Sequence, residues 1–223
     1  MEFYKSASNY IKENSKIYKA YKKNHKLISK YILIIGLIIN FIYGVFKLIT
    51  GIYYKSIWFM TFAAYYLMLC FIKLGLAKNY ENSIVKQYEK IKHTGITLLL
   101  MNIILFGIIM LIINTNQVFY YPGYLIYIVA IYDFYLIISA FVSVIKYRKH
   151  KEPIILASKT VSLTVAMVSM ISLEMAMFYT FGNNEVEIRN LITQILGFGV
   201  IFTNSFSAIM LIIKSKKVKL FLE

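Results

Sequence analysis

The chain has almost no cysteine or proline and few acidic residues. Cys70 is the one cysteine among 223 residues, so a disulfide within the chain is excluded. The two prolines, Pro122 and Pro153, fall near the beginnings of expected helices, where a missing N–H costs little. Ten acidic residues stand against 25 Lys and Arg, which gives a net charge of +15. The fold therefore needs a source of stability other than disulfides, and the positive charge needs a physical explanation.

Long apolar blocks make up most of the sequence, and hydrophobic residues account for 59% of it. The blocks have the length of about 20 residues that carries a helix across roughly 30 Å of hydrocarbon. Backbone polar groups in lipid must be satisfied within their own segment, which favours helices over short isolated strands. We therefore predict an all-α, polytopic membrane bundle with six transmembrane helices. The expected spans are residues 31–52, 57–77, 96–113, 118–145, 154–181 and 191–213, after a basic segment, 1–30, and before a short basic tail, 214–223.

Positive charge alternates between the two sides of this predicted bundle. With Lys73 counted in the link after the second span, 21 of the 25 Lys and Arg residues lie in the N-terminal segment, in the links after the second and fourth spans, and in the tail. The positive-inside rule then places both termini in the cytoplasm. Nucleic-acid binding is disfavoured, because these basic residues lie between apolar blocks and not on one soluble surface. The expected location is the inner or plasma membrane of a bacterial cell, since Lys, Ile, Tyr and Asn richness fits an AT-rich genome.

Residues 1–30 contain eight lysines, with Tyr and Ile recurring among them at helical spacing. This pattern predicts a basic amphipathic helix that lies on anionic lipid headgroups. A simpler interpretation is that the segment only anchors the topology through its charge. Both interpretations make the lipid bilayer the expected partner.

Ionisable side chains within the expected spans are the strongest functional candidates, because each costs a few kcal/mol in the bilayer unless it reaches water or a partner. The four considered are Lys47, Asp133, Lys159 and Glu174. Lys159 lies about one turn into its helix and can extend towards the interface. Asp133 lies near mid-membrane and needs a partner or an aqueous cavity. Lys47 and Glu174 have similar expected depths, which suggests an ion pair between them.

Two roles for these charges stay open on sequence grounds. They could fix helix packing through ion pairs and hydrogen bonds, or they could form a transport path with a proton relay through Asp133 or Glu174. The fifth span, residues 154–181, is rich in Ser, Thr and Ala, which allow close helix approach, so it is expected to be central. Short enzyme motifs are missing from the sequence. We therefore expect a non-enzymatic protein without a cofactor.

Asn40, Lys47, Gly51 and Ser56 have a spacing that resembles the first helix and loop of the cation diffusion facilitators, which are six-helix divalent-metal/proton antiporters. Residues 153–157, Pro-Ile-Ile-Leu-Ala, also resemble the beginning of that family's fifth helix. The resemblance implies a facilitator-like scaffold and a homodimer. It also adds Asn40 to the candidate polar site.

The facilitators bind metal through His or Asp residues on their second and fifth helices. The matching positions here are Tyr65, Leu69, Val161 and Val165, none of which is a ligand of the expected kind. The resemblance therefore implies the scaffold without a metal site. Residues 121–127 and 158–163 resemble segments of small, uncharacterised six-helix membrane proteins of Firmicutes bacteria, from which no activity follows.

The sequence as a whole favours a transporter-like membrane protein for a small solute or a cation, with proton coupling as one option. The candidate site comprises Asp133, Glu174, Lys47, Lys159 and Asn40. The alternative is an accessory, sensory or scaffold subunit whose intramembrane charges pair with one another or with a partner and carry nothing across.

Overall fold

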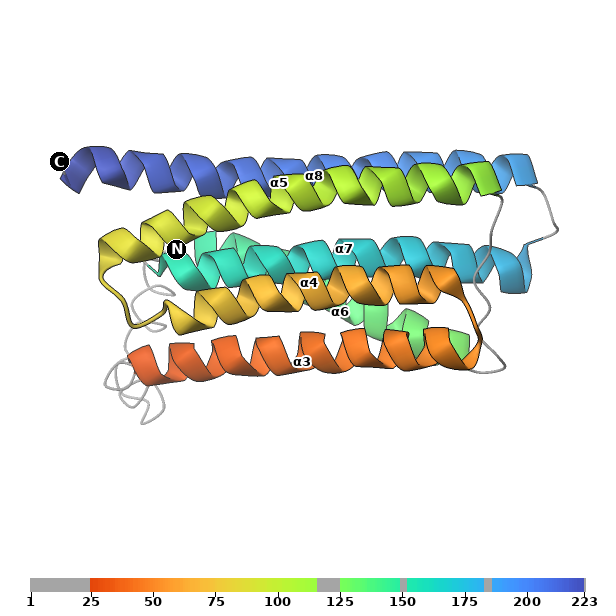
Figure 1. The fold of residues 1–223 in the computed structure, drawn as a ribbon, viewed down its shortest axis with the longest axis horizontal. Coiled ribbons are helices and arrows are strands. Elements are labelled where there is room, and N and C mark those ends of the chain that lie inside the picture. Colours follow the sequence, from red (N-terminus) through yellow and green to blue (C-terminus); the bar gives the residue numbers. More distant parts are fainter. Residues whose placement is uncertain (1–24, 116–124, 149–151, 183–185, 223) are drawn as a thin grey trace, which may run out of the picture.

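The computed structural model describes residues 25–115, 125–148, 152–182 and 186–222 (Figure 1). These residues form helices and short turns without a strand, and every helix is long and apolar enough to cross a membrane. The predicted all-α class with six spanning helices is thus confirmed. The helices are α3 (His25–Tyr53), α4 (Ile57–Lys78), α5 (Ile84–Thr115), α6 (Leu125–Arg148), α7 (Pro153–Phe181) and α8 (Val186–Leu222).

Two helices extend well past the apolar spans that the sequence predicted. Helix α5 begins at Ile84, although the expected span began at residue 96, and α8 continues to Leu222. Both extensions are basic, so hydropathy did not mark them, yet α5 and α8 run side by side (Figure 1). Ser215 of α8 donates a 2.7 Å hydrogen bond to the carbonyl of Tyr88 in α5. Of the predicted basic amphipathic segment, residues 25–30 form the beginning of α3, and residues 1–24 lie outside the described residues.

The turn between α3 and α4 has clear local causes. Ser56 caps α4, where its Oγ accepts a hydrogen bond from the backbone N–H of Phe59 at 3.5 Å. Gly51 allows the two helices to approach closely, because a Cβ at this position would lie 2.9 Å from the backbone nitrogen of Met60. Two of the four residues behind the facilitator resemblance therefore have structural roles in this turn.

Helix α7 is the centre of the bundle, as its small residues predicted. In its most apolar 18-residue window 83% of residues are buried, against at most 44% in any other helix. It packs against α3, α4, α5, α6 and α8. Large apolar side chains on the other helices point outward, as lipid contact requires.

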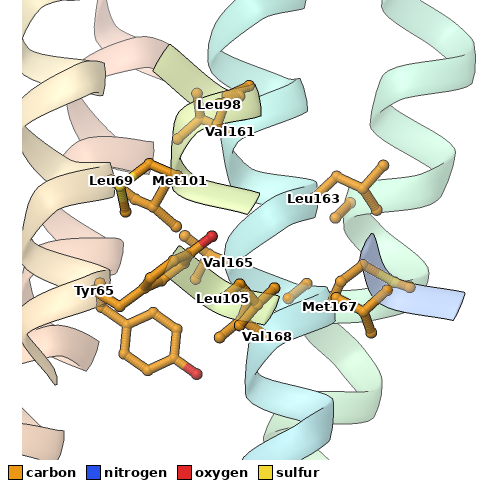
Figure 2. Close-up of a cluster of buried hydrophobic side chains, with 14 of the residues drawn as sticks. Tyr65, Leu69, Leu98, Met101, Leu105, Val161, Leu163, Val165, Met167 and Val168 are labelled. Carbon is orange, nitrogen blue, oxygen red and sulfur yellow. The ribbon is translucent and has the colours of Figure 1, made fainter. Parts of the chain in front are cut away.

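The core lies where α4, α5 and α7 meet. Figure 2 shows side chains from these three helices packed into one apolar cluster. All four positions that match the facilitators' metal ligands, Tyr65, Leu69, Val161 and Val165, belong to it. Because lipid tails are as apolar as these side chains, van der Waals packing supplies much of the cohesion here.

Helices α3 and α6 both pack on α7, but within the described ranges their backbones do not contact each other. The same holds for α6 and α8. One opening beside α6 is lined by residues of α3, α6 and α7, and a second is lined by residues of α6, α7 and α8. These two openings, and the buried side chains of Lys47 and Asp133 outside them, are described below.

Candidate intramembrane polar site

Lys47 and Asp133 are fully buried ionisable residues that lie near each other in the described structure. Helix α3 supplies Lys47 and α6 supplies Asp133, both side chains are 0% exposed, and the two charges interact electrostatically. Tyr43 lies one turn before Lys47 on the same helix face. Its hydroxyl donates a 3.1 Å hydrogen bond to Asp133 Oδ1, and its ring centroid lies 5.4 Å from Lys47 Nζ. The pair therefore links two helices whose backbones do not meet.

Two serines of α7 complete this centre. Lys47 Nζ donates a 2.9 Å hydrogen bond to Ser172 Oγ, and the Ser169 hydroxyl, which donates to the Ala166 carbonyl at 2.9 Å, lies beside Asp133. The Ser172 hydroxyl proton is donated to the carbonyl of Ser169 at 3.0 Å, which leaves an oxygen lone pair for the ammonium group. Asp133 Oδ2, in contrast, is buried without a hydrogen-bond partner in the described structure. An acceptor of this kind can take a proton or a hydrogen-bond donor.

A polar cleft of about 370 Å³ lies between α3 and α6, with α7 behind it. Asn40 of α3, Ser139 and Ser143 of α6, and Lys159 and Ser162 of α7 contribute its polar groups. The Asn40 side chain is 7% exposed, and its Nδ2 has no hydrogen-bond partner in the described structure. A buried amide donor without a partner is costly, so a polar solute in the cleft would stabilise it.

Lys159 lines this cleft instead of lying alone at a helix end. Its Nζ lies 5.8 Å from the ring centroid of Tyr147 on α6. Asn40 and Lys159, which sequence reasoning named separately, are therefore brought to the same cleft.

Lys73 is a buried lysine that sequence reasoning missed as an intramembrane charge. The alternation of positive charge groups Lys73 with the basic residues of the link after the second span, although it lies within the expected span 57–77. Its side chain is 0% exposed, and Nζ donates to Ser162 Oγ at 2.6 Å and to the Gly36 carbonyl at 3.2 Å. Gly36 and Ser162 both line the polar cleft. The position of Lys73 within an expected span was the available signal.

Glu174 belongs to a different part of the molecule. Its Oε1 accepts a 2.8 Å hydrogen bond from Thr193 of α8, and its electrostatic neighbour is Arg189. Lys47 has Asp133 as its electrostatic partner. In the described structure the charged neighbour of Lys47 is thus Asp133 and not Glu174, the partner that the sequence suggests. Similar depth in two helices does not bring side chains together unless both helices also present them to the same side.

Across the described ranges, no group of three or more His, Cys, Asp or Glu side chains could hold a metal ion. The candidate site is thus a set of buried ammonium groups, hydroxyls, one amide and one carboxylate around α3, α6 and α7.

Comparison with protein families, with curated proteins and with solved structures finds no match to the chain.

Proposed function

We propose that this integral membrane protein transports a small polar solute, with the polar cleft between α3, α6 and α7 as the solute site. The observation that carries the proposal is the unpartnered amide donor of Asn40 in a cleft that also contains Lys159. Groups of this kind in the bilayer are costly, and they mark solute pathways in many membrane proteins.

The charges around the cleft favour an anionic solute over a cationic one. Lys159 lines the cleft, and Lys73 donates to Ser162 on its wall. The cleft-lining residues within the described part of the chain include no Asp or Glu. An anion would offset the two ammonium groups, whereas a metal cation would meet like charge and too few oxygen ligands. Small inorganic anions and short carboxylates fit this description.

In this proposal, Lys47 and Asp133 control passage of the solute beyond the polar cleft. Tyr132 lines the cleft and packs on Tyr43, with ring centroids 5.7 Å apart, and Tyr43 donates to Asp133. Proton uptake by Asp133 would leave the charge of Lys47 uncompensated and weaken this connection. Proton coupling through Asp133 is therefore part of the proposal.

The test is uptake into proteoliposomes with chloride, nitrate, acetate, lactate and phosphate, and with sodium and potassium as cation controls. We expect protein-dependent flux of at least one anion, lost in Lys159→Gln and Asn40→Ala. Lys92→Gln, which removes an exposed lysine on α5, is the matched control and should retain flux. Cation flux without anion flux would contradict the solute class.

The alternative function is a non-transporting subunit whose buried charges only fix helix packing. It is supported by the full burial of Lys47 and Asp133, neither of which lines a described cleft. Under this alternative, no solute enters the proteoliposomes, and Asp133→Asn lowers stability or removes a co-purifying membrane partner. That combination of results would sink the transport proposal.

A further inference from the structure

The second opening beside α6 faces α8 and has a different chemistry. A cleft of about 390 Å³ lies there, with Phe134 of α6, Leu196 of α8 and several residues of α7 around it. Phe178 and Phe181 add two more aromatic rings, and Met170 and Met177 add flexible apolar walls. This volume lies within the range of roughly 300–1,000 Å³ that is usual for small-molecule sites.

Among the described residues, Glu174 is the one charged residue on the wall of this apolar cleft. The side chain is 8% exposed, and Oε1 accepts the hydrogen bond from Thr193. Oε2 is buried and accepts no hydrogen bond in the described structure. The positive charge of Arg189 interacts electrostatically with Glu174, but Oε2 still has no hydrogen-bond donor in the described structure. A carboxylate oxygen therefore lies unpartnered beside an apolar cavity.

We infer that this cleft binds a lipophilic organic cation, with the Glu174 carboxylate as its counter-charge. A quaternary ammonium or phosphonium ion provides a positive counter-charge for the Glu174 carboxylate. Its aromatic or alkyl groups provide apolar surface that can pack against the walls of the cleft. The faces of the phenylalanine rings add cation–π attraction.

Other occupants match the cleft less well. An inorganic cation needs several oxygen ligands, and this wall offers one carboxylate. A lipid acyl chain would contact the phenylalanine and methionine side chains but would bring no positive charge to the Glu174 carboxylate. An anion would meet the charge of Glu174. This site is separate from the proposed solute cleft, and its test is a binding measurement that does not depend on transport.

The experiment is equilibrium dialysis of the purified full chain in detergent micelles with radiolabelled tetraphenylphosphonium. We expect saturable binding at one site per chain. Glu174→Gln keeps an oxygen for the Thr193 hydrogen bond, so the fold should persist while affinity falls roughly ten- to hundredfold, as expected for one charge-assisted contact. Glu187→Gln removes an exposed carboxylate near the beginning of α8 and should bind like the unaltered protein.

Two further measurements separate the charge from the apolar surface. Tetraphenylborate has nearly the same shape with a negative charge, and it should not compete. Leu196→Trp fills the cleft without changing Glu174 and should also remove binding. Absence of saturable binding to the unaltered protein, unchanged affinity in Glu174→Gln, or equal binding of tetraphenylborate would each overturn the inference. Thermal unfolding of each variant checks that it is folded.

Discussion

Tyr43 donates its hydroxyl proton to Asp133 across a separation of 90 residues, in a 3.1 Å hydrogen bond between α3 and α6. The backbones of these helices do not contact each other, so side chains provide the described connection between them. The same bond holds one oxygen of the carboxylate that interacts with Lys47. The Tyr43 hydroxyl therefore both connects α3 to α6 and positions the Asp133 carboxylate near Lys47.

Replacement of Tyr43 by Phe removes this hydroxyl and keeps the ring. The free energy of unfolding should fall by about 1 kcal/mol, because Asp133 loses a hydrogen-bond donor at a fully buried position. Denaturant titration of the protein in mixed micelles measures the change. Tyr53→Phe is the matched control, since that side chain is 77% exposed, and it should change little. Equal losses in the two variants would contradict the role of the Tyr43 bond.

Lys47 and Asp133 should be coupled energetically. Either Lys47→Ala or Asp133→Ala leaves one buried charge without its partner, which costs roughly 3–5 kcal/mol. The double variant should therefore lose less than the sum of the two single variants, with a coupling of about 1–3 kcal/mol. A second cycle with Lys47→Ala and Glu174→Ala should be additive. Additivity in the first cycle, or strong coupling in the second, would show that the partners are assigned incorrectly.

Lys73→Met tests whether the missed lysine serves function or stability. Methionine keeps most of the volume and removes a fully buried charge, so the free energy of unfolding should stay the same or rise by up to about 1 kcal/mol. Anion uptake should fall, because the positive potential beside the cleft is reduced. Lys78→Met removes an exposed lysine on the same helix and should leave uptake unchanged. A large loss of stability in Lys73→Met would instead indicate a structural role.

Gly51→Ala should destabilise the hairpin of α3 and α4. The new Cβ would lie 2.9 Å from both the backbone nitrogen and Cγ of Met60, and such crowding costs about 1–3 kcal/mol. Gly107→Ala in α5 meets no heavy atom within 4 Å, so it should stabilise its helix by roughly 0.5–1 kcal/mol. Thermal unfolding of both variants gives the comparison. A stabilising Gly51→Ala would show that the hairpin packs less closely than described.

The link between α4 and α5 should have a pH-dependent contact. Lys30 Nζ donates a 2.6 Å hydrogen bond to Glu81 Oε1, and this bond and the lysine charge lower the pKa of Glu81 below 4.5. A lowered pKa contributes stability above pH 4.5, and that contribution is lost as the pH falls through the lowered value. Both groups are exposed, so the effect should be small. Glu81→Gln should lower the midpoint of thermal unfolding slightly at pH 7, and by progressively less as the pH falls through the lowered pKa of Glu81.

Parts of the site could be predicted because an ionisable side chain in an apolar span has a free-energy cost that is visible from the sequence alone. Asp133, Lys47 and Glu174 stood out as charges in apolar spans, and the structure buries all three. Lys73 could have been found in the same way, but its place in the charge alternation concealed it. Asn40 was named from a resemblance, and its unpartnered amide became visible only with the neighbouring helices in place. Partners could not be assigned, because sequence gives depth along a helix but not the direction in which the side chain meets another helix.

The sequence by itself determined the six spanning helices and the central position of α7. A helix in lipid satisfies its backbone within its own segment, so apolar length is enough to define it, and a run of small residues is enough to bring neighbours close. Tertiary structure decided that Lys47 meets Asp133, that Lys73 reaches the polar cleft, and that Glu174 lies in a separate apolar cleft. Those outcomes depend on how each helix is rotated about its axis and on which helices leave space between them.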